Sequence, residues 1–140
     1  MQRLPKLAVV LVLVGGVGAM VWNLLAPGGS GAIVQVKVPE LSALAEQGRQ
    51  AFDKNCAQCH GLNAAGTDKG PPFVHAIYNP GHHEDQAFFH AVRQGVRQHH
   101  WPFGDMPAQP LVSDQEIAWI VRYVRELQDA NGITYQAHQM

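Results

Sequence analysis

The clearest chemical pattern in this chain is Cys56-Ala57-Gln58-Cys59-His60. It holds both of the chain's two cysteines, and a histidine follows the second directly. Two thiols one helical turn apart can add across the two vinyl groups of a haem to form thioethers, and the next residue is then held under the iron as an axial ligand. We therefore predict that one haem c is attached covalently through Cys56 and Cys59, with His60 as an iron ligand.

Two other interpretations of this motif stay open. A thioredoxin-like redox pair has the same spacing, but it normally follows a strand in a βαβ unit, whereas a helical pattern precedes Cys56. A zinc half-site would need more ligands; there is no second cysteine pair, although histidines could complete such a site. The count of two cysteines excludes a disulfide framework and a four-cysteine zinc site.

Met106 is the candidate for the second axial ligand. It is the one methionine among the chain's 4 that does not lie in the amino-terminal segment or at the carboxyl end. Gly104 and Pro107 flank it and indicate a turn that would bring the thioether over a haem face. A methionine–histidine pair leaves no open iron position, which favours electron transfer over oxygen or peroxidase chemistry. The alternative is a methionine of the apolar core.

Histidines cluster between residues 75 and 100, at positions 75, 82, 83, 90, 99 and 100. Any of them could compete with Met106 for the iron. His82, His83, His99 and His100 could instead bind a second metal ion, copper or zinc in an exported protein. These two pairs flank a predicted helix, however, whose ends would be about 24 Å apart. We therefore expect separate sites or polar loop histidines, rather than one four-histidine site.

Three helical patterns must position these residues. Apolar residues recur at three- and four-residue spacing over residues 41–55, over residues 85–98 and after Ser113, which forms a capping box with Glu116. Gly48 is costly within a helix and predicts close approach of another helix. Residues 61–84 and 101–112 are rich in glycine and proline. Two such long loops leave too little protein core, so a large apolar group should fill the centre.

The amino end has the pattern of a membrane segment. Residues 7–26 carry no charge and would span roughly 30 Å as a helix, enough to cross the hydrocarbon core of a bilayer. Arg3 and Lys6 precede this run, which places the amino end in the cytoplasm and exports the rest of the chain. A cleaved signal peptide is the alternative. Residues 27–31 indicate a flexible linker, and residues 32–38 a short strand or an extended tether.

Over about residues 41–130 the chain resembles the class I c-type cytochromes of the small bacterial monohaem kind. The matching features are the helix-crossing pair Gly48 and Phe52, their partners Ile120 and Tyr123, the loop Gly70-Pro71-Pro72-Phe73 and the ligand loop Gly104-Asp105-Met106-Pro107. The resemblance implies that the Pro71 carbonyl accepts a hydrogen bond from the His60 ring. It also implies that the Trp101 indole is directed at a haem propionate; packing beside Phe103 is the alternative.

We accordingly predict an all-α cytochrome c fold, with three main helices and long loops around one covalent haem, plus a transmembrane helix. The expected divisions are an anchor or signal peptide at 1–26, a linker at 27–40, the cytochrome c domain at 41–130 and a tail at 131–140.

The expected function is a membrane-tethered carrier of single electrons between redox proteins, and not an enzyme. It would be anchored once in a bacterial inner membrane, through residues 7–26, with its domain in the periplasm. A haem subunit of a larger dehydrogenase or oxidase, and a histidine-rich, copper-linked redox sensor, are the alternatives. The net charge of −1 argues against a nucleic-acid partner.

Overall fold

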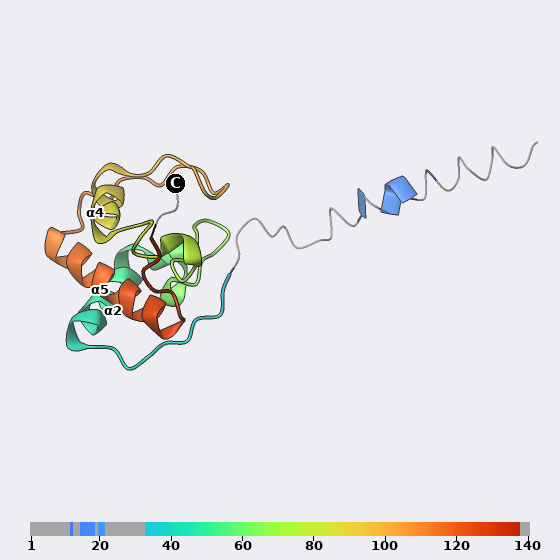
Figure 1. Ribbon diagram of the computed structural model, residues 1–140. Helices are drawn as coiled ribbons and strands as arrows, with labels where there is room; N and C mark the ends of the chain where they lie inside the picture. Colours follow the sequence, from blue (N-terminus) through green and yellow to red (C-terminus); the bar gives the residue numbers. More distant parts are fainter. Residues whose placement is uncertain (1–11, 13–14, 19, 22–32, 138–140) are drawn as a thin grey trace, which may run out of the picture.

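The computed structural model describes residue 12 and residues 15–18, 20–21 and 33–137 (Figure 1). Most of the predicted membrane segment 7–26 lies outside these residues, and among the residues described no helix is both long and apolar enough to cross a bilayer. The folded part contains α2 (Ala43–Asn55), α3 (Ala57–His60), α4 (Asp85–Gln94) and α5 (Asp114–Ala130), with short 3-10 turns η1 (Leu62–Ala64) and η2 (Ala76–Tyr78). The described part holds no strand, in agreement with the predicted all-α class.

Side-chain caps determine where two of the helices begin. The Ser42 hydroxyl accepts a hydrogen bond from the Ala45 backbone N–H and starts α2. The predicted capping box is present at the start of α5, where the Ser113 hydroxyl accepts from the Glu116 N–H and the Glu116 carboxylate accepts from the Ser113 N–H. These bonds satisfy backbone donors that have no partner within the helix, so the two starts follow from local sequence.

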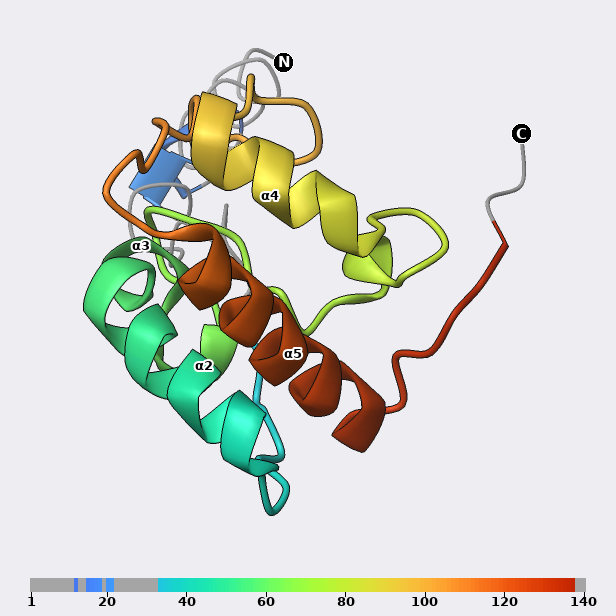
Figure 2. The same ribbon diagram turned by 90° about the vertical axis from the view of Figure 1, so that its left-hand side faces the viewer.

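Helices α2 and α5 cross in close contact, and α5 lies between α2 and α4 in the view of Figure 2. Gly48 is at the crossing, because a Cβ there would lie 1.9 Å from the Trp119 carbonyl oxygen. Next to it, the Phe52 and Tyr123 rings pack edge to face with centroids 5.7 Å apart. The close approach predicted from Gly48 is confirmed, and this crossing holds the carboxyl end of α2, where the Cys56 motif begins.

The second helix is shorter than the predicted span 85–98, and the prediction of its end was wrong. Helix α4 ends at Gln94 because Gly95 adopts φ +75°, a left-handed conformation typical of a residue just past a helix end. The chain then reverses, and Val96 and Met106 exchange two backbone hydrogen bonds of 2.9 Å as an antiparallel bridge. This pairing makes residues 96–106 a hairpin.

Residues 33–42 are extended and lie against the domain. The Val34 N–H donates to the Ala65 carbonyl over 2.9 Å, and the Asn131 side chain exchanges two hydrogen bonds with the Lys37 backbone. Val34 and Val36 also pack against the core. No strand forms here, and residues 34–37, within the predicted linker 27–40, are attached to the folded unit.

Candidate functional site

The helices surround one large cavity of about 660 Å³, within the usual size range of cofactor sites. Its walls come from the end of α2, from α3, from α4, from the hairpin 96–106 and from the start of α5. All six residues predicted to bind the cofactor line it: Cys56, Cys59, His60, Pro71, Trp101 and Met106. A cavity of this size in so small a domain matches the expectation that a large apolar group fills the centre.

The His60 ring is held in one orientation. The ring is 7% exposed, and its Nδ1 lies 3.0 Å from the Pro71 carbonyl oxygen. Because a carbonyl oxygen can only accept a hydrogen bond, Nδ1 carries the proton and Nε2 carries the free lone pair. Phe73 stacks on the ring with centroids 4.2 Å apart. Burial lowers the pKa of His60, although the bond to Pro71 acts in the opposite direction. The result is a neutral imidazole with its Nε2 available to a metal.

The two cysteines are free thiols in unequal surroundings. Cys59 is exposed and Cys56 is partly buried. Burial raises the pKa of Cys56 to about 12, and the neighbouring Cys59 adds to this shift. A redox-active C-x-x-C pair needs a lowered thiol pKa, so this site does not favour the thioredoxin-like interpretation. Among the described residues, the side chains close enough to share a metal ion are His82, His83 and His100. Neither cysteine belongs to this group, so the zinc half-site gains no support.

Met106 is placed by the backbone of the hairpin. Its two hydrogen bonds to Val96 tie it to the residue that follows the reversal at the end of α4. Gly95 lies so close that a Cβ on it would be 2.5 Å from the Met106 carbonyl oxygen. Met106 lines the same cavity as His60 and is partly buried; His99 and His100 also line this cavity, but they are exposed. The position of Met106 thus depends on its backbone pairing with Val96 and on Gly95, the residue directly before the hairpin.

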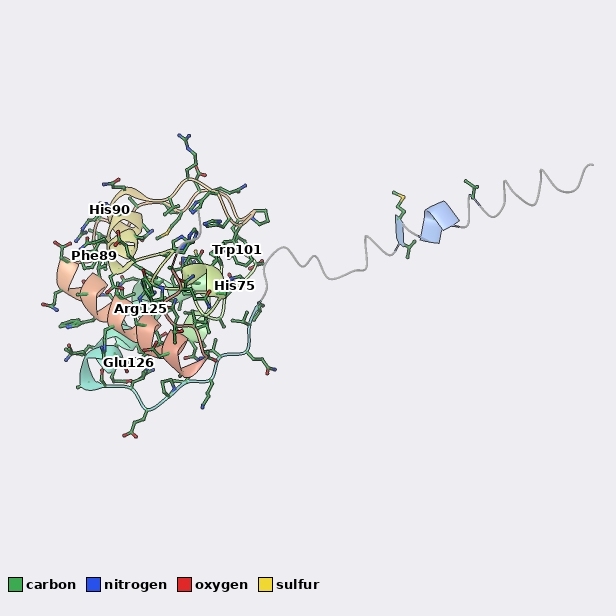
Figure 3. All side chains as sticks on the ribbon, in the orientation of Figure 1. His75, Phe89, His90, Trp101, Arg125 and Glu126 are labelled. Carbon is green, nitrogen blue, oxygen red and sulfur yellow. The ribbon has the colours of Figure 1, made fainter. Side chains whose placement is uncertain are left out.

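Trp101 carries a buried donor without an acceptor. Its Nε1 is the buried side-chain polar atom that finds no hydrogen-bond partner in the described part of the chain. Its ring meets His75 edge to face at 5.1 Å, and Figure 3 shows the two residues on the same side of the domain. Burial raises the pKa of Tyr78 to about 12, and the Trp101 N–H, which lies near the Tyr78 hydroxyl without forming a hydrogen bond of good geometry, acts in the other direction. Trp101 lines the cavity, and its buried N–H is a donor for which the described residues supply no acceptor.

A family comparison identifies the domain. Residues 45–128, more than half of the 140-residue chain, match the model of the Cytochrome c family. The chain belongs to the cytochrome c family. Members of this family bind haem c and are generally electron carriers. No curated protein and no solved structure matches the chain.

The residues at the cavity fit a haem c. The chain offers two thiols, a neutral imidazole with its Nε2 free and a thioether, which is the donor set of this cofactor. The walls are mainly apolar, with Phe73, Phe88 and Val92 among them. The unpaired Trp101 N–H supplies a donor for a carboxylate. The family and the site residues therefore agree.

The histidine pairs lie together, and the expectation that a helix separates them was wrong. Helix α4 has 10 residues and is only about 15 Å long, and the five residues 96–100 span about 16 Å when extended. The reversal at Gly95 thus carries His100 back to the start of α4, where His82 and His83 lie. The His100 ring is centred 5.3 Å from that of His82 and 5.4 Å from that of His83, and His99 is adjacent.

The positions of Phe73 and Gly95 were missed at the sequence level. Phe73 was noted only as part of the Gly-Pro loop, yet it stacks on the His60 ring and contacts Phe52 and Phe88. Nothing in its local sequence signals that contact. Gly95 lies inside the predicted helix 85–98, although a glycine directly after a helix is a frequent end signal and indicates the reversal of the chain.

Proposed function

We propose that this cytochrome c carries single electrons between redox proteins while it is tethered to a membrane. The observation that carries the proposal is that Cys56, Cys59, His60 and Met106 line one cavity. In this proposal the thiols of Cys56 and Cys59 add across two vinyl groups, each S–H supplying its sulfur to one carbon and its hydrogen to the other. His60 Nε2 and the Met106 sulfur are the two iron ligands.

A haem held in this way supplies one iron that alternates between Fe(III) and Fe(II). The chain's residues determine how readily it does so. Pro71 and Phe73 fix the His60 ring, and the neutral sulfur of Met106 favours Fe(II), which raises the reduction potential. The Trp101 N–H donates to a propionate and offsets part of its charge. If His60 and Met106 both bound the iron, no position on it would remain open for a substrate, which supports electron transfer over catalysis.

Met106 is favoured over the nearby histidines as the second iron ligand. Its backbone is paired with Val96, and its side chain lines the cavity. His99 and His100 lie beyond this pairing, in the exposed part of the hairpin, and the His99 Nδ1 is engaged by the Arg97 carbonyl at 2.9 Å. These histidines also line the cavity, so the preference for Met106 rests on its lower exposure and on its backbone pairing.

The exposed side of the site is proposed as the surface for partners. Cys59 lines the cavity and is exposed, while the neighbouring His60 is buried, so the cavity is open to solvent along this edge. Electron transfer needs short distances, and redox partners are therefore expected to contact the domain near Cys59.

The membrane tether rests on the sequence. The uncharged run 7–26, preceded by Arg3 and Lys6, supports a single anchor in a bacterial inner membrane with the domain in the periplasm. A tether through the linker would keep the domain at high effective concentration near membrane partners. A haem subunit of a larger dehydrogenase or oxidase would use the same segment as an assembly helix.

The decisive experiment on the cofactor is the optical spectrum of the purified protein, oxidised and reduced, with a pyridine haemochrome assay. We expect c-type haem and, in the oxidised form, the long-wavelength sulfur-to-iron charge-transfer band. Met106→Ala should lose this band while keeping the covalent haem, and His90→Ala should keep both. A purified protein without covalent haem would overturn the proposal. If Met106→Ala kept the charge-transfer band, as His90→Ala is expected to do, Met106 would not be the iron ligand.

A second experiment separates the shuttle from the subunit. The full chain is expressed in a bacterium, and the membrane fraction is extracted with a mild detergent. The shuttle proposal predicts that the haem protein stays with the membrane until detergent is added, and then elutes alone. Elution in a complex of fixed stoichiometry with a dehydrogenase or oxidase would favour the subunit. Recovery in the periplasmic soluble fraction would show that residues 1–26 are a cleaved signal.

A further inference from the structure

We propose that His82, His83 and His100 form a binding site for one first-row transition-metal ion, with Cu²⁺ bound most tightly. Each of the three residues offers one ring nitrogen, and these three atoms all lie within 4.8 Å of one another. The site is separate from the four residues proposed to hold the haem, although His83 and His100 also line the edge of the cavity.

The spacing of the ring nitrogens is close to that of a metal site. The Nε2 atoms of His82 and His100 are 3.3 Å apart and share a hydrogen bond, in which a bound ion would replace the proton. Two imidazole nitrogens bound to one tetrahedral ion at about 2.0–2.1 Å would be about 3.3 Å apart, so this pair already has the required separation. The remaining nitrogen belongs to His83 and lies within 4.8 Å of the other two, so each of its two distances has to shorten by no more than about 1.5 Å. A small movement of the His83 side chain toward the other two rings supplies this change.

His83 has the hydrogen-bond pattern of a metal ligand. Its Nδ1 is 2.7 Å from the Ile77 carbonyl oxygen, which can only accept a hydrogen bond. Nδ1 therefore carries the proton, and the lone pair is on Nε2. Histidines that bind metals commonly donate their other ring N–H to a backbone carbonyl in this way, because the bond fixes the tautomer and the ring orientation.

The backbone that carries His82 and His83 is held in place. The N–H groups of both residues donate to the Asn79 carbonyl, over 3.0 and 2.9 Å. The Arg125 guanidinium on α5 donates to the His83 carbonyl and also to the Asp85 carboxylate. Arg125 is therefore a clamp between α5 and the turn before α4, and it fixes one half of the site before any ion binds.

The hairpin that carries His100 is also stabilised by its own side chains. The Gln98 N–H donates to the Asp105 carboxylate over 2.9 Å, and the Gln98 side-chain oxygen accepts from the Gly104 N–H over 2.6 Å. The two halves of the site thus come from separately stabilised segments that meet at the start of α4. Such ordering before binding reduces the entropy lost when an ion is bound.

The donor set selects the kind of metal. Three imidazole nitrogens suit copper, zinc and nickel, whereas calcium and magnesium require oxygen ligands. Among divalent first-row ions, affinity at a nitrogen site is highest for Cu²⁺. Because His100 is exposed, water can complete the coordination. The inference is that one such ion is held at the edge of the haem cavity.

The experiment uses the full-length protein with its haem oxidised, so that the cysteines are blocked as thioethers and the haem cannot reduce copper. ZnCl₂ and CuSO₄ are titrated separately by calorimetry into the unaltered protein, His82→Ala, His100→Ala and His90→Ala. His90 is the matched control, since it is an exposed histidine on α4, outside the group of three, and lies away from Trp101 in Figure 3. The far-ultraviolet circular dichroism spectrum of each variant verifies that it is folded.

We expect one ion of either metal per chain, with Cu²⁺ tighter than Zn²⁺. His82→Ala and His100→Ala should each weaken binding at least about tenfold, the scale on which even supporting residues act at metal sites, and His90→Ala should change nothing. The electron paramagnetic resonance spectrum of bound Cu²⁺ should show hyperfine splitting from several imidazole nitrogens.

Three results would overturn the proposal. The first is the lack of stoichiometric binding of either metal, which would leave the histidines as a hydrogen-bonded cluster. The second is equal weakening by His100→Ala and His90→Ala, which would indicate non-specific binding. The third is a changed haem spectrum in His100→Ala, which would make His100 an iron ligand. Only this last result would also remove Met106 from the proposed function, so the two proposals can fail separately.

Discussion

Replacing Gly48 by alanine tests the helix crossing on which the whole site depends. The added Cβ would lie 1.9 Å from the Trp119 carbonyl oxygen and 2.9 Å from the Tyr123 Cβ. Carbon and carbonyl oxygen normally come no closer than about 3.3 Å, so α5 would have to move away from α2 by more than about 1 Å.

The expected cost follows from two opposing effects. Overpacking of this kind costs about 1–3 kcal/mol, and a clash with backbone places this case near the upper end. Alanine recovers about 1 kcal/mol over glycine within a helix. The net loss is about 2 kcal/mol, which for a domain of this size lowers the melting temperature by about 8–16 °C.

The assay is thermal unfolding of the haem-loaded protein, followed by circular dichroism. Gln47→Ala is the control, because Gln47 is exposed on the same helix, and its unfolding free energy should change by less than about 0.5 kcal/mol. A Gly48→Ala protein more stable than the unaltered one would refute the reasoning. It would mean that helix propensity outweighs the contact and that the two helices do not cross this closely.

Three further predictions concern the site and its support. Trp101→Phe should cost the haem-loaded protein about 1.5–3 kcal/mol in denaturant unfolding, because a bond to a charged acceptor is lost; no loss would mean that the N–H has no acceptor in the cavity. Gly95→Ala places a side chain at φ +75° against the Met106 carbonyl. On heating, the charge-transfer band of this variant should therefore disappear at a lower temperature than that of the unaltered protein. An unchanged temperature would contradict a role of Gly95 in placing Met106. Hydrogen bonds from the Ser113 N–H, and to a smaller extent from its hydroxyl, lower the pKa of the Glu116 carboxyl. The ionised carboxylate therefore stabilises the fold at pH values above its ordinary pKa, and this stabilisation is lost as the pH falls through the lowered pKa. The stability difference between the unaltered protein and Glu116→Gln, measured in urea, should therefore shrink on acidification, and a constant difference would argue against the capping box.

Much of the site was predictable because its signals are local. The Cys56 motif places two thiols and a histidine within one helical turn, and the structure adds only their surroundings. The Ser113 capping box and the glycine at position 48 likewise predicted a helix start and a helix crossing, since each depends on a few neighbouring residues.

Other predictions failed or were beyond reach because they depend on how the chain turns. The end of α4 was misplaced by an apolar pattern that continues past Gly95, although a single left-handed residue stops the helix. The expected separation of the histidine pairs followed from that error. Phe73 reaches His60 through packing between loops, which no spacing in the sequence encodes.

Short stretches of the sequence are enough to predict the chemistry proposed for this protein. Its cysteine motif, single domain methionine and helix patterns indicate a covalent haem in an all-α domain, because these features act over a few residues. Contacts between residues far apart in the chain depend instead on how the chain folds. Folding buried the Trp101 N–H without a partner and brought His100 to His82 and His83, since the reversal at Gly95 and the clamp of Arg125 act between segments far apart in the chain.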